Sequence, residues 1–364
     1  MTQTAIPFLF MRGGSSRGPY FRALDLPADR DAIGRVLVAV LGAGHPITID
    51  GLGGGVAVTT KVAILSPSEG DGADVDYLFA QVSPGTGAVD WGPTCGNILA
   101  GVGPAAVEMG LVPARDGETP VRIRAVNTGA RVEAAVVTPG GRVEYAGDEA
   151  IAGVPGTAAP VRLDFLDTVG GATGALLPTG AARDEIDGVG VTCMDVAMPM
   201  MIARAADLGV TGHETREALD ADRALVARLE RLRLEAGRRM GMGDVSKRVT
   251  PKVGLLARPR VGGTIAARYF MPWECHPSMA VTGAQCIAAC VLQPGTVAEG
   301  LAEELGDTSP TVVTIEHPSG TLAVTVAWEA GPDGPQVRSA GLVRTARLLA
   351  RGEAMVPRHV WSPR

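Results

Sequence analysis

Residues 94–103 read TCGNILAGVG, and residues 275–283 read CHPSMAVTG. Each stretch places a cysteine in a polar turn that is followed by small and apolar residues, a pattern that predicts a helix behind the turn. Aligned without a gap, residues 95–103 and 275–283 share the cysteine, one alanine and one glycine. The repeated order of strand, polar turn and glycine- and alanine-rich helix predicts two similar halves.

The length of the chain also indicates two domains. With 364 residues, it exceeds the size at which a single hydrophobic core stops growing. Composition shifts most in a stretch rich in glycine and proline at residues 153–180, so we place the domains at 1–180 and 181–364. Other expected elements are strands at 6–11, 189–196 and 264–270, helices at 30–41, 221–240 and 279–291, and a basic helix at about 340–351.

Composition excludes several classes of partner and site. The net charge is −6 and aromatic residues make up 4%, so neither a basic phosphate-binding surface nor a base-stacking platform is indicated, and no nucleic acid is expected as partner. The five cysteines are odd in number and irregularly spaced, which argues against a disulfide framework or a zinc site. No apolar run is long enough to span a membrane, so we expect a cytoplasmic protein without a membrane partner.

Cys95 is the first candidate for chemistry. Unpaired backbone N–H groups at a helix start, here those of Gly96 and Asn97, favour a thiolate or a bound carboxylate together with the positive end of the helix dipole. The alternative is a buried, inert thiol. Two such helix starts facing one cleft would suit a substrate with a carboxylate at each end.

Glycine-rich loops in the first half add further candidates. Ser15, Ser16 and Arg17 lie in the loop RGGSSRG at residues 12–18, where glycine allows close approach to a ligand and serine offers a rotatable donor. Lys61 follows a second such loop and heads the apolar run at 62–65, so it is expected at the beginning of a strand. A snorkelling surface lysine is the alternative.

The second half offers Arg268, expected on a strand, and His276 and Ser278, expected in the turn before a helix. For Arg268 the alternatives are a surface ion pair and substrate binding. For His276 they are packing at the helix start and contact with a substrate carboxylate. Lys247 and Lys252 are expected on the surface.

Several motifs in order resemble the PrpF family over nearly the whole chain. They are residues 11–18, 50–54, 60–64, 74–77, 95–97, 153–158, 177–180, 243–245 and 281–284. The resemblance implies an α+β fold of two similar diaminopimelate-epimerase-like domains, each a β-sheet wrapped around a central helix, with the active site in the cleft between them. Epimerases of this fold use one cysteine from each half. Here the resemblance puts Ala280 at the second position.

The resemblance also implies a cofactor-independent isomerase that catalyses a 1,3-allylic proton shift in a small unsaturated polycarboxylate. Lys61 is the expected base, and Cys95 either donates a proton or holds the substrate. The first candidate substrate is 4-oxalomesaconate, and 2-methylaconitate and methylitaconate are the near alternatives. No metal is expected, and a homodimer is a candidate assembly. An amino-acid epimerase is disfavoured by Ala280, and a non-catalytic polycarboxylate-binding accessory protein is the alternative from another class.

Overall fold

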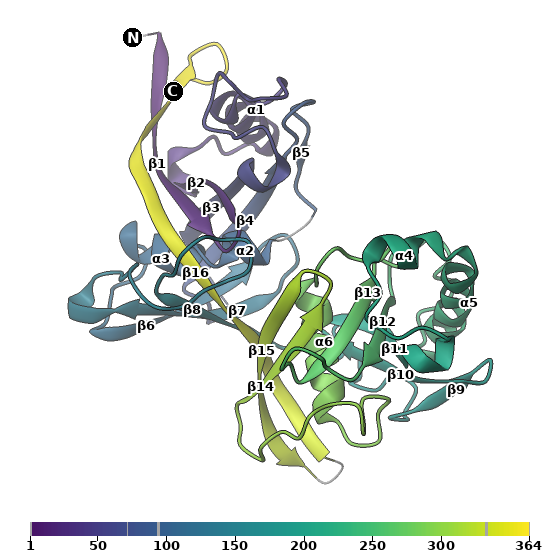
Figure 1. The fold of residues 1–364 in the computed structure, drawn as a ribbon. Coiled ribbons are helices and arrows are strands. Elements are labelled where there is room, and N and C mark those ends of the chain that lie inside the picture. Colours follow the sequence, from purple (N-terminus) through teal and green to yellow (C-terminus); the bar gives the residue numbers. More distant parts are fainter. Residues whose placement is uncertain (1, 71, 93–94, 332–333, 364) are drawn as a thin grey trace. The chain divides into compact units, whose positions relative to one another are not determined.

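The computed structural model describes residues 2–70, 72–92, 95–331 and 334–363, and it divides into two compact units (Figure 1). Unit 1 comprises Met1–Asp164 and Val343–Arg364, and unit 2 comprises Phe165–Leu342. These units differ from the expected ranges 1–180 and 181–364. Residues 165–180 belong to unit 2, and the C-terminal residues from 343 onward return to unit 1.

The strands of unit 1 form a closed ring. In sheet order they run β1, β2, β3, β4, β6, β7, β8 and β16, and β16 pairs in turn with β1. The helices α2 and α3 contact this ring from β1, β2 and β3 to β6 and β7. The bounds are β1 Gln3–Gly13, β2 Ser16–Arg22, β3 Lys61–Pro67, β4 Val75–Val82, β5 Val89–Asp90, α2 Gly96–Leu99, α3 Val102–Glu108, β6 Gly117–Ala125, β7 Arg131–Thr138, β8 Pro160–Leu166 and β16 Gly334–Pro357.

Helix α1 (Arg30–Leu41) begins and ends at residues that are typical of helix ends. The Asp29 carboxylate accepts a hydrogen bond from the Ala32 N–H at 2.8 Å, and Gly42 ends the helix with a φ of 65°. An aspartate directly before a helix and a glycine directly after it are among the residues favoured at these positions. One apolar face of α1 packs into a core that also includes side chains of β2, β3 and β4. The predicted helix at 30–41 is therefore confirmed.

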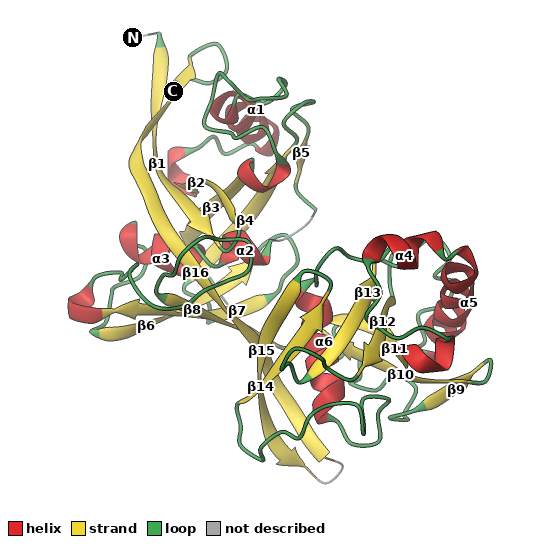
Figure 2. Cartoon of the chain, in the orientation of Figure 1, coloured by secondary structure: helices red, strands yellow, loops and turns green. Residues whose placement is uncertain are grey.

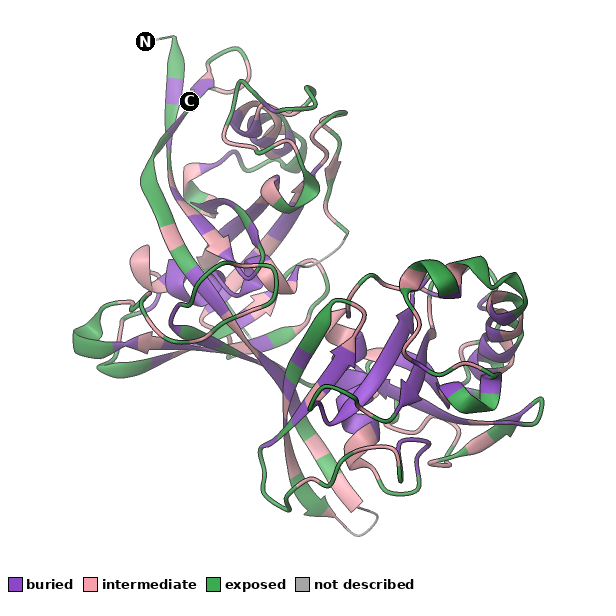
Figure 3. Cartoon of the chain, in the orientation of Figure 1, coloured by how far each residue is buried: buried purple, intermediate pink, exposed green. Residues whose placement is uncertain are grey.

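Unit 2 is a sheet in the order β16, β15, β14, β13, β12, β11, β10 and β9. Helix α6 contacts β10, β11, β12, β14 and β15 and is buried at every residue from Gly283 to Cys290. A helix that is apolar all round is typical of a core position. Figures 2 and 3 show this helix against strands whose residues are largely buried. The bounds are β9 Asp184–Ile186, β10 Val189–Val196, β11 Met198–Arg204, α4 Arg216–Ala221, α5 Arg223–Arg239, β12 Lys252–Ala257, β13 Ile265–Phe270, α6 Val281–Leu292, β14 Thr311–His317 and β15 Gly320–Gly331.

The two units repeat one pattern of strand pairing. In unit 1, β1–β2 is antiparallel, β2–β3 parallel, β3–β4 antiparallel, β4–β6 parallel and β6–β7 antiparallel. In unit 2, β10–β11, β11–β12, β12–β13, β13–β14 and β14–β15 follow the same alternation. The central helices also enter at the same place, after β4 and β5 in unit 1 and after β13 in unit 2. The predicted two similar halves are therefore present as topology.

The basic helix expected at about 340–351 is wrong, because these residues belong to the long strand β16. Gly341 lies opposite Thr325 of β15, and Leu348 lies opposite Met11 of β1. Pairing with the preceding strand β15 at one end and with β1, from the other end of the chain, at the other end overrides the local helical pattern. The same strand explains the return of the C-terminus to unit 1. No helix in the described ranges is both long and apolar enough to cross a membrane.

Candidate active site

Lys61 and Cys95 meet in unit 1. The ammonium Nζ of Lys61 lies 3.2 Å from the Cys95 Sγ and 5.6 Å from the centre of the Phe79 ring. Lys61 is the first residue of β3 and is half-buried, while Cys95 is buried. The Lys61 side chain thus turns towards the Cys95 thiol. The catalytic roles of both residues stay predictions.

The start of β3 is held by the two neighbouring strands, β4 and β2. The Thr60 hydroxyl donates to the Val82 carbonyl at 2.7 Å, and the Gln81 side-chain amide donates to the Thr60 carbonyl at 3.3 Å. On the other side, Gly18 of β2 approaches so closely that a Cβ there would lie 2.8 Å from the Lys61 carbonyl carbon. The Lys61 backbone is thus fixed by its neighbours rather than by its own side chain.

Cys95 stands at the N-terminus of α2 with an extended backbone. The first hydrogen bond of this turn runs from the Leu99 N–H to the Cys95 carbonyl at 2.9 Å, so the N–H groups of Gly96 and Asn97 precede it. Tyr20 secures the turn, because its hydroxyl donates to the Ile98 carbonyl at 2.6 Å. The helix predicted behind the cysteine is present, although α2 ends at Leu99 before α3 begins. Pro93 and Thr94, which precede the cysteine, lie outside the described residues.

The glycine loop of residues 13–15 packs against this turn. The Asn97 side-chain amide donates to the Ser15 hydroxyl at 3.1 Å. Gly14 has a φ of 51°, and a Cβ there would collide with the Asn97 side chain. The Arg12 guanidinium donates to the Gly14 carbonyl at 2.8 Å and to the Thr345 carbonyl at 3.0 Å. Ser15 and Asn97 thus present polar groups beside Cys95.

Two buried tyrosines lie near the thiol. Burial raises the pKa of both Tyr20 and Tyr77 well above its usual range, and negative charge on Cys95 raises it further. Both phenols therefore stay protonated over any ordinary pH range. They supply neutral hydroxyls and aromatic surface around Cys95, rather than a base.

Ser16 and Arg17 differ from each other in their surroundings. Ser16 is buried, and its hydroxyl has no hydrogen-bond partner within the described ranges. Arg17 is exposed, with its guanidinium 5.7 Å from the centre of the Phe10 ring. A buried hydroxyl without a partner is unusual, so Ser16 keeps a free donor at the start of β2.

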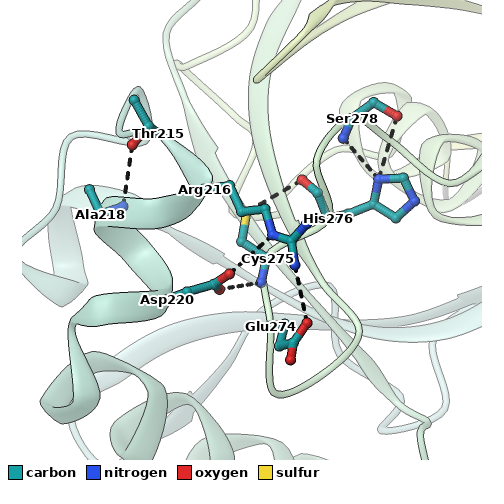
Figure 4. A network of polar contacts seen from close by, with 8 residues as sticks. All are labelled: Thr215, Arg216, Ala218, Asp220, Glu274, Cys275, His276 and Ser278. Carbon is teal, nitrogen blue, oxygen red and sulfur yellow. Dashed lines mark hydrogen bonds and ion pairs between the residues drawn. The ribbon is translucent and has the colours of Figure 1, made fainter.

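His276 and Ser278 form a compact turn before α6 in unit 2 (Figure 4). The Ser278 N–H donates to the His276 Nδ1 at 2.9 Å, and the imidazole packs edge-on against Tyr269 with ring centres 6.0 Å apart. Burial lowers the pKa of His276, so a neutral ring is favoured. The residue directly before α6 is Ala280, and His276 does not cap this helix.

Cys275 is a structural thiol in the same network (Figure 4). It is buried, its N–H donates to Asp220 at 2.7 Å, and burial raises its pKa to about 11. Asp220 in turn pairs with Arg216 at 3.1 Å, and Arg216 reaches Glu274 at 3.2 Å. These contacts hold the turn that carries His276.

Arg268 lies on β13, as expected, but it is neither on the surface nor in an ion pair that the structure shows. Its side chain is buried and donates to the carbonyls of Glu214 at 2.8 Å and Ala267 at 3.0 Å. The surface ion pair is therefore wrong. The guanidinium instead fastens the segment that leads into α4.

The comparison with known proteins decides the family. The family model described as PrpF protein matches residues 3–357. The chain belongs to the PrpF family. A 4-oxalomesaconate tautomerase of Pseudomonas putida is 51% identical over 361 residues, which are 99% of each chain. A solved methylitaconate-delta-isomerase is 33% identical, with a TM-score of 0.90 over 100% of this chain and 98% of its own. A hydroxyproline epimerase from Agrobacterium vitis shares the fold at 14% identity, with a TM-score of 0.50 over 100% of this chain and 94% of its own.

These relatives confirm the resemblance to the PrpF family, the expected epimerase-like α+β fold and the isomerase class of activity. The structure also shows which residue of unit 2 corresponds to Cys95. In both units of this PrpF chain one residue directly precedes the central helix, Cys95 before α2 and Ala280 before α6. The alignment of Cys95 with Cys275 is therefore not the structural one, and Ala280 is the structural counterpart of Cys95.

Sequence reasoning missed several residues that build the site in this PrpF chain. Tyr20, Phe79 and Gln81 belong to alternating strands, and nothing in that alternation marks them as contacts of Lys61 or of the Cys95 turn. Asn127 supports the same region, because its amide bonds to the Phe79 backbone at 2.8 and 2.9 Å and to the Trp91 carbonyl at 2.7 Å. Within the described part of the chain no group of three metal-ligating side chains gathers at any point.

Proposed function

We propose that this chain catalyses a 1,3-allylic proton shift in a small unsaturated polycarboxylate, with 4-oxalomesaconate as its substrate. The observation that carries the proposal is the Lys61–Cys95 contact of 3.2 Å. It places a candidate base and a candidate acid side by side in a member of the PrpF family. The substrate is chosen because the 51% identical relative is named a 4-oxalomesaconate tautomerase.

The proposed reaction begins with neutral Lys61 and the protonated Cys95 thiol. Lys61 takes a proton from the carbon next to the alkene, and the C–H electron pair becomes the dienolate of the conjugated carboxylate or keto group. Cys95 then protonates the far carbon, so that the double bond moves by one position. The lysine ammonium finally returns its proton to the thiolate across the 3.2 Å contact. Both residues are then restored without a cofactor.

The dienolate carries negative charge that fixed donors must stabilise. Around Cys95 these are the N–H groups of Gly96 and Asn97 and the hydroxyls of Ser15 and Ser16, and we assign them to one carboxylate and its conjugated oxygen. Arg17 follows Ser16 on β2 and is exposed. The hydroxyl of Ser16 supports this assignment, because it is buried and has no partner within the described ranges.

Contacts of His276 and Ser278 with a substrate carboxylate stay predictions. Both residues belong to the turn that precedes α6. Arg268 receives no role, because its guanidinium donates to backbone carbonyls. All five cysteines are free, which suits the reducing cytoplasm as location, and the homodimer stays a prediction.

Methylitaconate is the second candidate substrate, because the solved methylitaconate-delta-isomerase matches the whole chain with a TM-score of 0.90. The test is a proton NMR assay of the purified protein with 4-oxalomesaconate, methylitaconate and 2-methylaconitate in parallel. The proposal expects the highest kcat/KM with 4-oxalomesaconate. A higher value with either of the others would replace the substrate, and no turnover of any of the three would leave only a binding role.

A further inference from the structure

Asn127 lies in the turn between β6 and β7 of unit 1, and its side chain continues the edge of β4. Strand β6 pairs with β4 as far as Tyr77, and β5 pairs with β4 from Gln81 onward. Phe79 lies between these two pairings. The Asn127 amide accepts a hydrogen bond from the Phe79 N–H at 2.8 Å and donates one to the Phe79 carbonyl at 2.9 Å. It thus takes the place of a backbone peptide group beside β4.

The same amide also reaches the segment that leads to Cys95. Its nitrogen donates a second hydrogen bond, to the Trp91 carbonyl, at 2.7 Å. Trp91 directly follows β5 and lies four residues before Cys95. An asparagine side chain offers a carbonyl oxygen and two N–H donors, and Asn127 uses all of them. One side chain therefore joins β4 to the segment before the thiol.

Both segments that Asn127 joins bear on the contact between Lys61 and Cys95. The centre of the Phe79 ring lies 5.6 Å from the Lys61 Nζ. The same Nζ lies 3.2 Å from the Cys95 Sγ. The Asn127 amide therefore links the strand that borders the lysine to the segment that leads into the cysteine turn.

The backbone that carries Asn127 is itself fixed. The Val126 N–H donates to the Tyr77 carbonyl at 2.8 Å, so the hydrogen bonds between β6 and β4 continue up to Asn127. The Gly129 N–H donates to the Ala125 carbonyl at 2.8 Å, and Gly129 has a φ of 76°, which favours glycine. A side chain on such a backbone can hold other segments in place.

We infer that Asn127 is a positioning residue that holds the Cys95 thiol beside the Lys61 ammonium. Its hydrogen bonds go to backbone groups of Phe79 and Trp91, so it acts through these groups. The catalytic consequence rests on the proposed isomerase activity, in which a proton passes between the two residues. The placement of the thiol does not depend on that reaction.

Three variants separate this role from support of the turn alone. Asn127→Ala removes all three hydrogen bonds, whereas Asn127→Asp keeps the acceptor for the Phe79 N–H and has no N–H donor. Thr138→Val is the matched control, because Thr138 lies at the other end of β7, is buried and donates to the Arg115 carbonyl at 2.8 Å. All three variants should lower Tm, since each loses hydrogen bonds.

The first measurement is the rate of Cys95 alkylation by iodoacetamide at pH 8, read by peptide mass spectrometry, which needs no turnover. Loss of the bond to Trp91 should free the segment before the thiol, so both Asn127 variants should react about threefold to tenfold faster than the wild type. Thr138→Val should keep the wild-type rate, which separates the effect from a general loss of stability. An unchanged rate in both Asn127 variants would overturn the inference, because the thiol would then keep its place without the amide.

The second measurement is kcat and KM with 4-oxalomesaconate by NMR. Displacement of the thiol should lower kcat about tenfold to a hundredfold in both Asn127 variants and change KM less than about threefold. Thr138→Val should keep both wild-type values. Wild-type kcat in both Asn127 variants would overturn the inference. Faster alkylation of Cys95 in these variants, without turnover of any candidate substrate by the wild type, would uphold the positioning role and overturn the proposed reaction instead.

Discussion

The change Gly18→Ala tests whether the backbone of Lys61 positions the reaction. Gly18 lies on β2 beside the start of β3, where a Cβ would stand 2.8 Å from the Lys61 carbonyl carbon and closer still to its oxygen. Ordinary contact begins at 3.4 Å. The neighbour is backbone rather than a flexible side chain, so β3 has to move away from β2.

The size of this movement follows from the same contacts. The carbonyl carbon must retreat by about 0.6 Å and its oxygen by more, which displaces Lys61 on the order of 1 Å. Misplacement of a reacting group by about 1 Å can cost roughly a hundredfold in rate. Overpacking of this kind costs about 1–3 kcal/mol of stability, and each kcal/mol lowers Tm by about 2–4 °C in a protein domain of this size.

The assay is kcat by NMR together with Tm by circular dichroism. Gly352→Ala is the matched control, because Gly352 also lies on a strand and a Cβ there would meet nothing within 4 Å. We expect kcat of Gly18→Ala to fall about a hundredfold while Gly352→Ala keeps both wild-type values. A Gly18→Ala variant with wild-type kcat would refute the reasoning, because Lys61 would then tolerate the movement.

Two further predictions concern the thiols and the acid stability of unit 1. Iodoacetamide at pH 8 should modify Cys95 and abolish activity, because Cys95 is 9% exposed, whereas the other four thiols are fully buried. Burial also raises the pKa of Cys193 to about 12 and that of Cys275 and Cys290 to about 11, so modification of several thiols in the native protein would contradict the structure. The hydrogen bond from Arg124 holds the pKa of Asp76 below its usual value, so its stabilisation is complete above about pH 4 and is lost as pH falls through the lowered pKa. In urea unfolding from pH 2 to 7, the free energy of unfolding of Asp76→Asn should therefore fall less steeply towards acid pH than that of the wild type. The same pH profile for both proteins would refute this prediction.

Local signals were sufficient for much of the fold. Asp29 and Gly42 mark both ends of α1, and the small, apolar residues of α6 mark a buried helix. The strand β16 could not be predicted in the same way, because its partners β15 and β1 lie at opposite ends of the chain. Since β16 carries the C-terminus back to unit 1, the domain ranges expected from composition also differ from the two units.

Site residues could be predicted where the residue type and its local sequence context together indicate a function. Cys95 before a helix and Lys61 at the head of a strand could both be found from sequence, and the structure brings them together. The expectation that Lys252 is a surface residue is wrong, because Lys252 is half-buried at the start of β12. The equivalence of Lys252 to Lys61 lies in strand order and pairing, and the sequence carries a signal for it, because residues 61–65 (KVAIL) and 252–256 (KVGLL) share their lysine, valine and last leucine. The role of Arg268 could not be predicted from sequence. A charged residue on a strand gives no sign that its guanidinium donates to backbone carbonyls instead of binding a ligand.

The most direct test of the central claim is deuterium incorporation from heavy water into the allylic carbon of 4-oxalomesaconate, followed by NMR. The wild type should incorporate deuterium rapidly, and Lys61→Met should incorporate none above background. Cys95→Ala should still exchange at the carbon that Lys61 deprotonates but form little isomerised product. Incorporation by Lys61→Met at the wild-type rate would contradict the account, because another group would then be the base.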